Sequence, residues 1–197
     1  FPVEGVTLAG KVKADIQTKG KYSDVEAGKY DRLPTSGTAS LTGLKYASSD
    51  LPYSVTVSTA EAAFDPKKID VKNTKGTIGK SDFAVSGAIN NYMGYLFGPN
   101  ETIKGTMNLN STLLDLNEFM TETEETTTTD TTSYGVIPVP ANIDFVLHSE
   151  IKTVKMMDFT LSDATGDIIV KDGVADLHGI KFNMLGGAFI VDGAYDT

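Results

Sequence analysis

One strand pattern occurs twice in this chain, and an internal repeat of this kind sets the architecture before any motif does. Residues 82–91 (DFAVSGAINN) and 188–197 (AFIVDGAYDT) carry Phe, Val, Gly and Ala in the same register. In each copy apolar residues alternate towards a glycine, and a stretch that contains two glycines comes before them. The pattern predicts a repeated β unit, and nothing between the two copies resembles catalytic chemistry.

The same alternation with period two, typical of strands with one apolar side, runs through most of the chain. In residues 6–18, Val12 and Ile16 fall on one side of the predicted strand, and Lys11 and Lys13 fall on the other. Counted along the chain, alternating runs predict about eleven strands. Three segments are predicted to lie outside strands: a connecting loop with a helical turn at 22–33, a short helix or turn at 112–120, and a short loop that ends at Gly166.

These strands need a partner for their apolar side, because no long amphipathic helix is predicted to cover it. Three arrangements satisfy this need: a closed barrel, two sheets packed face to face, or a curled open sheet whose concave apolar side is filled by its own ends or by an apolar ligand. Alternation alone does not choose among them.

Composition excludes several classes of protein. The net charge is −9 and the isoelectric point is near 4.6, which argues against a nucleic-acid partner and against electrostatic docking on anionic lipid. The chain has no cysteine, so it forms no disulfide or thiolate metal site. It has no apolar run of about 18 residues that would predict a membrane span. Because it opens at Phe1 without a methionine or a signal-like segment, we expect it to be a piece of a longer protein.

Residues 121–132 (TETEETTTTDTT) consist of threonine, glutamate and aspartate alone. They offer no apolar group to offset the entropy of ordering, so the composition predicts a solvated linker or long loop. The alternative is a glycosylated stretch, since Asp130-Thr131-Thr132 resembles a short acceptor pattern of some periplasmic proteins of gut bacteria.

Residues with catalytic or metal-binding chemistry are sparse. His148 falls on the polar side of its predicted strand with Glu150, and His178 precedes Gly179 where the alternation slips and a bulge is expected. Asp163 and Asp167, which flank Thr165 and Gly166, lack the regular oxygen spacing of a calcium loop. We therefore expect no catalytic residue, no cofactor and no metal site.

Several turn and glycine positions carry a resemblance to a known family. In the second half these are the run from Pro140 to Phe145, residues 170–173 (VKDG), the pair Gly186-Gly187, and the closing residues 193–195 (GAY). In the first half they are Gly37 with Leu41, residues 83–87 (FAVSG), residues 103–105 (IKG) and residues 114–117 (LDLN). Together and in this order they resemble the C-terminal region of the AsmA-like family.

The resemblance implies a periplasmic part of a large envelope protein of Gram-negative bacteria, anchored in the inner membrane by an N-terminal helix that is missing here and linked to outer-membrane biogenesis. The implied fold is mainly β: an elongated, curled antiparallel sheet with repeated β units, an apolar concave face and few short helices. Residues 1–120 would form a first sheet segment and residues 138–197 a second, continuous with it, joined by an acidic linker at 121–137.

The resemblance also implies that the apolar groove binds or conducts phospholipid. An acyl chain gains about 0.8 kcal/mol for each buried methylene and needs only a continuous apolar lining. The alternatives are that these residues are ordinary core of a structural or adhesive β-domain of the cell envelope, or that the chain is a hydrolase that uses carboxylates. The candidate lipid-facing residues are Val12, Ile16, Val55, Val57, Ile103, Met107, Leu109, Phe145 and Leu147.

Overall fold

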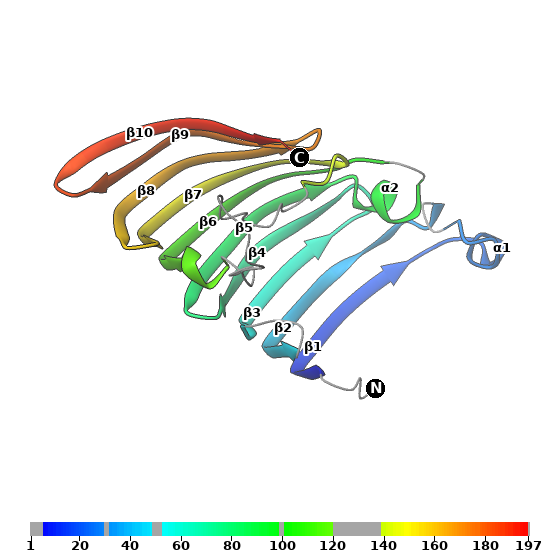
Figure 1. Ribbon diagram of the computed structural model, residues 1–197. Helices are drawn as coiled ribbons and strands as arrows, with labels where there is room; N and C mark the ends of the chain where they lie inside the picture. The colour runs from blue at the N-terminus through cyan, green and yellow to red at the C-terminus, as the bar shows by residue number, and fades with distance from the viewer. Residues whose placement is uncertain (1–5, 30–31, 49–52, 99–100, 120–138, 197) are drawn as a thin grey trace, which may run out of the picture.

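The protein is a single open β-sheet of ten strands that lie side by side in sequence order (Figure 1). The computed structural model describes residues 6–29, 32–48, 53–98, 101–119 and 139–196. Figure 1 shows the strands bowed along their length, and no second sheet packs against them in the described part of the chain. The strands are β1 Val6–Thr18, β2 Thr35–Ser48, β3 Val55–Phe64, β4 Lys68–Ile78, β5 Ser81–Asn90, β6 Ile103–Asp115, β7 Ile143–Met156, β8 Phe159–Lys171, β9 Val174–Met184 and β10 Gly187–Asp196.

Helices are few and short. They are α1 (Tyr22–Glu26), α2 (Tyr92–Phe97) and the 3-10 helix η2 (Leu116–Glu118). Each lies next to a strand end, and Figure 1 shows α1 and α2 at one margin of the sheet. The predicted fold class, mainly β with few short helices, is confirmed, and so is the helical turn predicted within 22–33.

Two strand predictions were wrong in their boundaries. The short loop predicted to end at Gly166 lies instead within β8, which is continuous from Phe159 to Lys171, and β6 continues through Asp115 rather than ending before 112. In β8 the cause is a bulge: Asp163 has φ 54, and the pairing with β9 shifts register between Ser162 and Asp167. A bulge interrupts period two, so a continuous strand is read from its sequence as two.

The prediction of an antiparallel sheet is wrong at one strand pair, because β6 and β7 run parallel. Ile103 pairs with Ile143 at one end of the two strands, and Asp115 pairs with Lys155 at the other. The end of β6 and the start of β7 therefore lie at opposite ends of the strands, about 40 Å apart. Joining them requires a crossover connection of a dozen residues or more. The predicted acidic linker 121–137 falls within this connection and lies outside the described residues.

The repeat found in the sequence is present in the sheet. Its two copies are β5 and β10, and each is the second strand of a hairpin, β4–β5 and β9–β10. The turns contain Gly79 with φ 58 and Gly186 with φ 81, a backbone region that favours glycine. Each copy thus lies in a meander of antiparallel strands: β5 is the fifth strand of β1–β6, and β10 is the last strand of β7–β10.

The start of β5 holds the far end of β6 through side chains. The backbone ladder between the two strands ends at Ala84 and Asn110. Beyond it, the Asp82 carboxylate accepts hydrogen bonds from the backbone N–H groups of Thr112, at 3.0 Å, and Leu113, at 2.7 Å. Partial burial opposes ionisation, but these donors outweigh it and hold the pKa of Asp82 below its ordinary value. Asp82 therefore extends the contact of β5 with β6 towards the point where the crossover begins.

Replacing Asp82 by alanine should lower the free energy of unfolding by about 1–2 kcal/mol at neutral pH, because two β6 N–H groups lose a charged acceptor. Since the pKa of Asp82 is lower in the folded than in the unfolded chain, its contribution is present above about pH 4 and is lost as the pH falls through the folded-state pKa. Urea unfolding at neutral and at strongly acidic pH measures both values. Asp15→Ala, at an exposed acid of β1, is the control. An equal loss at both pH values would contradict this role.

Candidate functional site

Two rows of apolar residues cross all ten strands of the sheet. Residues that pair across neighbouring strands share a face, so the register identifies each row. The first row is Ile16, Gly37, Phe64, Ile69, Ile89, Gly105, Phe145, Val170, Ala175 and Tyr195. The second row is Ala14, Ala39, Ala62, Val71, Gly87, Met107, Leu147, Ile168, Leu177 and Gly193. We call the face that carries both rows the apolar face.

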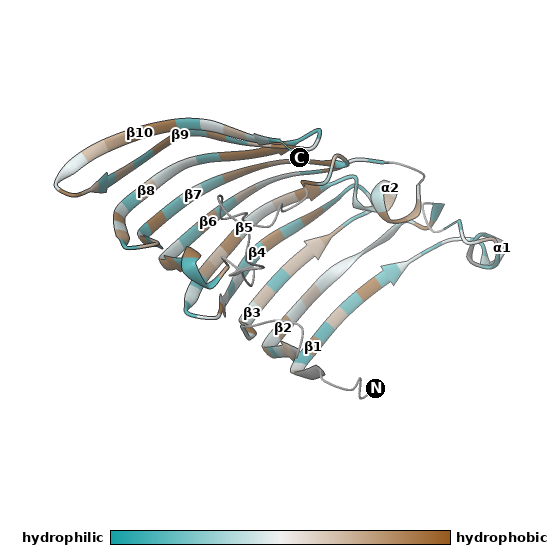
Figure 2. Cartoon of the chain, viewed as in Figure 1, coloured by the Kyte–Doolittle hydropathy of each residue, from teal (hydrophilic) through white to brown (hydrophobic). Residues whose placement is uncertain are grey.

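The opposite face, which we call the polar face, carries charged and hydrogen-bonding side chains. One register row on it runs through Ser86, Asn108, His148, Asp167 and His178. Figure 2 shows the hydrophilic and hydrophobic residues following one another along the strands. The two faces therefore differ in chemistry over the whole width of the sheet.

The apolar face is only partly removed from water. A buried cluster of Ile151, Val154, Leu161 and Ala164 lies on β7 and β8, but no large side chain of the described residues is fully buried. In the described part of the chain the buried hydrophobic residues are only Tyr92, Met107, Ile151, Val154, Leu161 and Ala164. Sheets normally cover such a face with a second layer, and here the described chain provides none.

All nine residues predicted to face lipid lie on the apolar face. Met107 pairs with Leu147, which places the candidates of β6 and β7 side by side, and Val57 pairs with Gly76, which in turn pairs with Phe83 of β5. Their exposure differs: Val12 and Ile16 at the edge are 71% and 57% exposed, whereas Met107 is buried at 8%. The other six are partly buried. Val12 and Ile16 are therefore the most open of the nine to a ligand, and Met107 acts chiefly in packing.

Glycines of the apolar face lie beneath large side chains of the neighbouring strand. Gly76 pairs with Phe83, and Gly105 pairs with Phe145. A Cβ atom added at Gly76 would lie 2.7 Å from the Phe83 ring, and one at Gly105 would be closer still to Phe145.

The strand pattern predicted from the sequence assigns no packing role to these glycines. A glycine that alternates in phase with apolar residues is the signal that could have revealed it, because a central glycine often marks a close approach.

The pair Gly105 and Phe145 gives a test of this packing. Gly105→Ala should destabilise the protein by about 1–3 kcal/mol, because the ring must move from its place over the glycine. In the double variant with Phe145→Ala the added methyl group fills vacated space, so the two effects should differ from additivity by at least about 0.5 kcal/mol. Equilibrium urea unfolding measures all four proteins. The control cycle pairs Gly105→Ala with Phe182→Ala on the distant β9, where the effects should add, and additivity in both cycles would contradict the proposed contact.

The two histidines each lie beside an aspartate on the polar face. His148 Nδ1 is 2.6 Å from Asp167 Oδ1 across the β7–β8 pair, so its partner is Asp167 and not Glu150 of its own strand. The bulge expected at His178 is confirmed: Gly179 has φ 59 and donates its N–H to Asp192 Oδ1 at 2.7 Å. Asp192 therefore stabilises a backbone irregularity.

The acids considered for a cation loop, Asp163 and Asp167, lie within β8 rather than in a loop. Among the described residues, no three or more histidine, aspartate or glutamate side chains gather in a group that could hold a metal ion.

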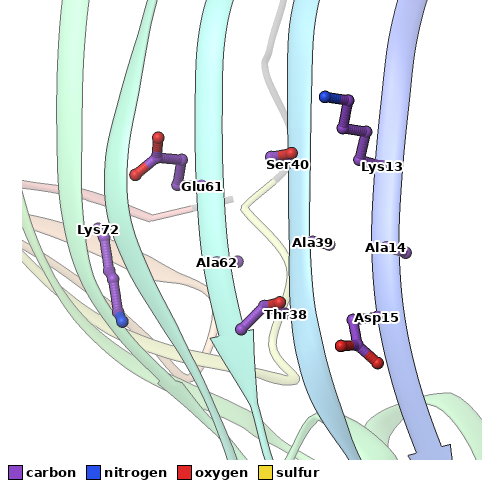
Figure 3. Close-up of a pocket in the computed structure, with 9 residues that line it drawn as sticks. All are labelled: Lys13, Ala14, Asp15, Thr38, Ala39, Ser40, Glu61, Ala62 and Lys72. Carbon is purple, nitrogen blue, oxygen red and sulfur yellow. The ribbon is translucent and has the colours of Figure 1, made fainter.

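Two shallow hollows open on the polar face. One lies over β1 to β4, where the side chains of Lys13, Glu61 and Lys72 project from different strands (Figure 3). The other lies over β3 to β5 and is lined by hydroxyl and charged residues that include Ser58, Lys75 and Asp82. None of the nine candidate lipid-facing residues lines either hollow. The concave placement predicted for the apolar face stays a prediction.

Comparison with known proteins identifies no relative. No protein-family model, no curated protein and no solved structure matches the chain. Within the described residues, no helix is long and apolar enough to cross a membrane. The AsmA-like resemblance and all that it implies therefore stay predictions.

Proposed function

We propose that this chain is a non-enzymatic module that binds phospholipid through the acyl chains, along the apolar face of its sheet. The observation that carries the proposal is the pair of uninterrupted apolar rows across ten strands with no covering layer. In the same proposal the module is the periplasmic part of an AsmA-like protein, anchored in the inner membrane and involved in outer-membrane biogenesis.

The dimensions of the apolar face suit an acyl chain. Ten strands at the usual spacing span about 43 Å, whereas one leaflet of a bilayer core is about 15 Å thick. An acyl chain gains free energy from each buried methylene and requires no directional contact, so mixed Val, Ile, Leu, Ala and Phe side chains are a sufficient lining. This explains why no compact motif marks the site.

Exposed apolar surface of this extent also needs a physical explanation. Soluble monomers rarely expose a contiguous apolar patch of more than a few hundred Å², and larger patches usually mark a binding surface. The polar face carries the charged side chains, so it suits contact with water while the other face holds lipid. Bound lipid would supply the second layer that covers the apolar face, which the described chain does not provide.

Native mass spectrometry of the protein purified from a bacterial host, followed by solvent extraction, tests the proposal. We expect phospholipid to copurify with the wild-type protein. The variant Val57→Lys with Leu147→Lys should carry about tenfold less, because a lysine ammonium against acyl chains loses its hydration. The matched control is Thr42→Lys with Thr106→Lys, which adds the same charges at exposed positions of the polar face.

Circular dichroism and urea unfolding establish that both variants keep the sheet. Wild-type protein that is free of lipid after purification, and that also takes up none from phospholipid vesicles, would contradict the proposal. Equal lipid loss in the two folded variants would place binding elsewhere than on the apolar face.

A further inference from the structure

Strand β10 ends the sheet with an open hydrogen-bonding edge. In the described part of the chain it pairs with β9 alone, and all ten of its residues are exposed. Edge strands of soluble proteins are usually protected from further pairing by lysine, proline or a bulge. The opposite edge strand, β1, carries Lys11 and Lys13, whereas β10 contains no lysine, arginine or proline. Each edge pair has one register shift, between Ala9 and Lys11 in β1–β2 and between Val191 and Gly193 in β9–β10, so the lysines are what distinguishes the two edges.

The internal repeat indicates what this edge can accept. Strand β5 is the repeat equivalent of β10, and its second edge pairs with the antiparallel strand β6. In that pair Met107 of β6 lies opposite Gly87 of β5, the position that corresponds to Gly193 in β10. At Gly193 no atom lies within 4 Å of an added Cβ. The edge of β10 therefore carries the same residue pattern as the edge of β5 that pairs with β6. It also leaves space for a large side chain over Gly193.

We infer that β10 pairs antiparallel with β10 of a second copy of this chain, about a two-fold axis that passes between the two Val191 residues. This register puts Phe189 of each copy opposite Gly193 of the other and so reproduces the ring-over-glycine packing of the sheet. Phe189 stacks on Phe182 of its own chain at 5.4 Å between ring centroids and is still 41% exposed.

Charge on the polar face agrees with the same register. Ile190, which is 68% exposed, falls opposite Asp192 of the second copy, so the two Asp192 carboxylates are offset and not directly opposed. The strand is thus self-complementary, which favours a second copy over an unrelated partner, and two-fold dimers are the commonest oligomers. The two apolar faces join into one continuous face. This inference does not rest on the proposed function.

Sedimentation equilibrium and cysteine cross-linking test the interface. We expect a species of twice 21.0 kDa that dissociates on dilution. The chain has no cysteine, so Val191→Cys introduces a single thiol per copy, and residues directly opposite in an antiparallel pair are close enough to form a disulfide. Val12→Cys, at the matched valine of the apolar face on β1, should stay uncrosslinked.

A pair of charge variants tests the register. Ile190→Lys should keep or tighten the dimer, because each lysine faces Asp192 of the other copy, whereas Ile190→Glu should weaken it about tenfold. Equal weakening by both would overturn the register. A wild-type protein that is monomeric at every concentration, or cross-linking at Val12→Cys in place of Val191→Cys, would overturn the interface itself.

Discussion

The cross-strand register is the constraint on which the rest of this structure depends. Side chains alternate between two faces, and a slip of one residue would transfer a whole strand of apolar groups to the polar face. Here the register from β1 to β10 brings Ile16 at one edge into the same row as Tyr195 at the other. The described chain has no second layer, so the cross-strand register, and not packing in an enclosed core, determines which side chains are neighbours on each face.

Much of the local structure could be predicted from the residues alone. The hairpin through Tyr46 and Val55 forms as its alternation and turn residues indicate, and all nine candidate residues share one face. These predictions succeeded because period two is a property of each strand by itself. Strand direction is not such a property: the sequences of β6 and β7 alternate in the same way whether the pair is parallel or antiparallel, so their parallel pairing could not be predicted.

The candidate site shows the same division between local and distant information. The sequence identifies which positions are apolar, but it does not predict how far each one is buried, because burial depends on the residue that pairs with it on the neighbouring strand. Met107 is buried through its packing on Gly87, which is distant in sequence, while Val12 is exposed because β1 has a neighbour on one side only. Likewise Asp82 has the sequence context of an ordinary strand residue, and its hydrogen bonds to β6 depend on where the backbone ladder stops.

Strand order has a consequence for how the chain folds. Within β1–β6 and β7–β10 each strand pairs antiparallel with the next one in sequence, so these meanders form through contacts between residues that are close along the chain. Joining β6 to β7 instead requires closure of residues 116–142, which carries the larger loss of chain entropy. Low contact order on both sides of one long closure favours a folding order in which the β6–β7 pairing forms last.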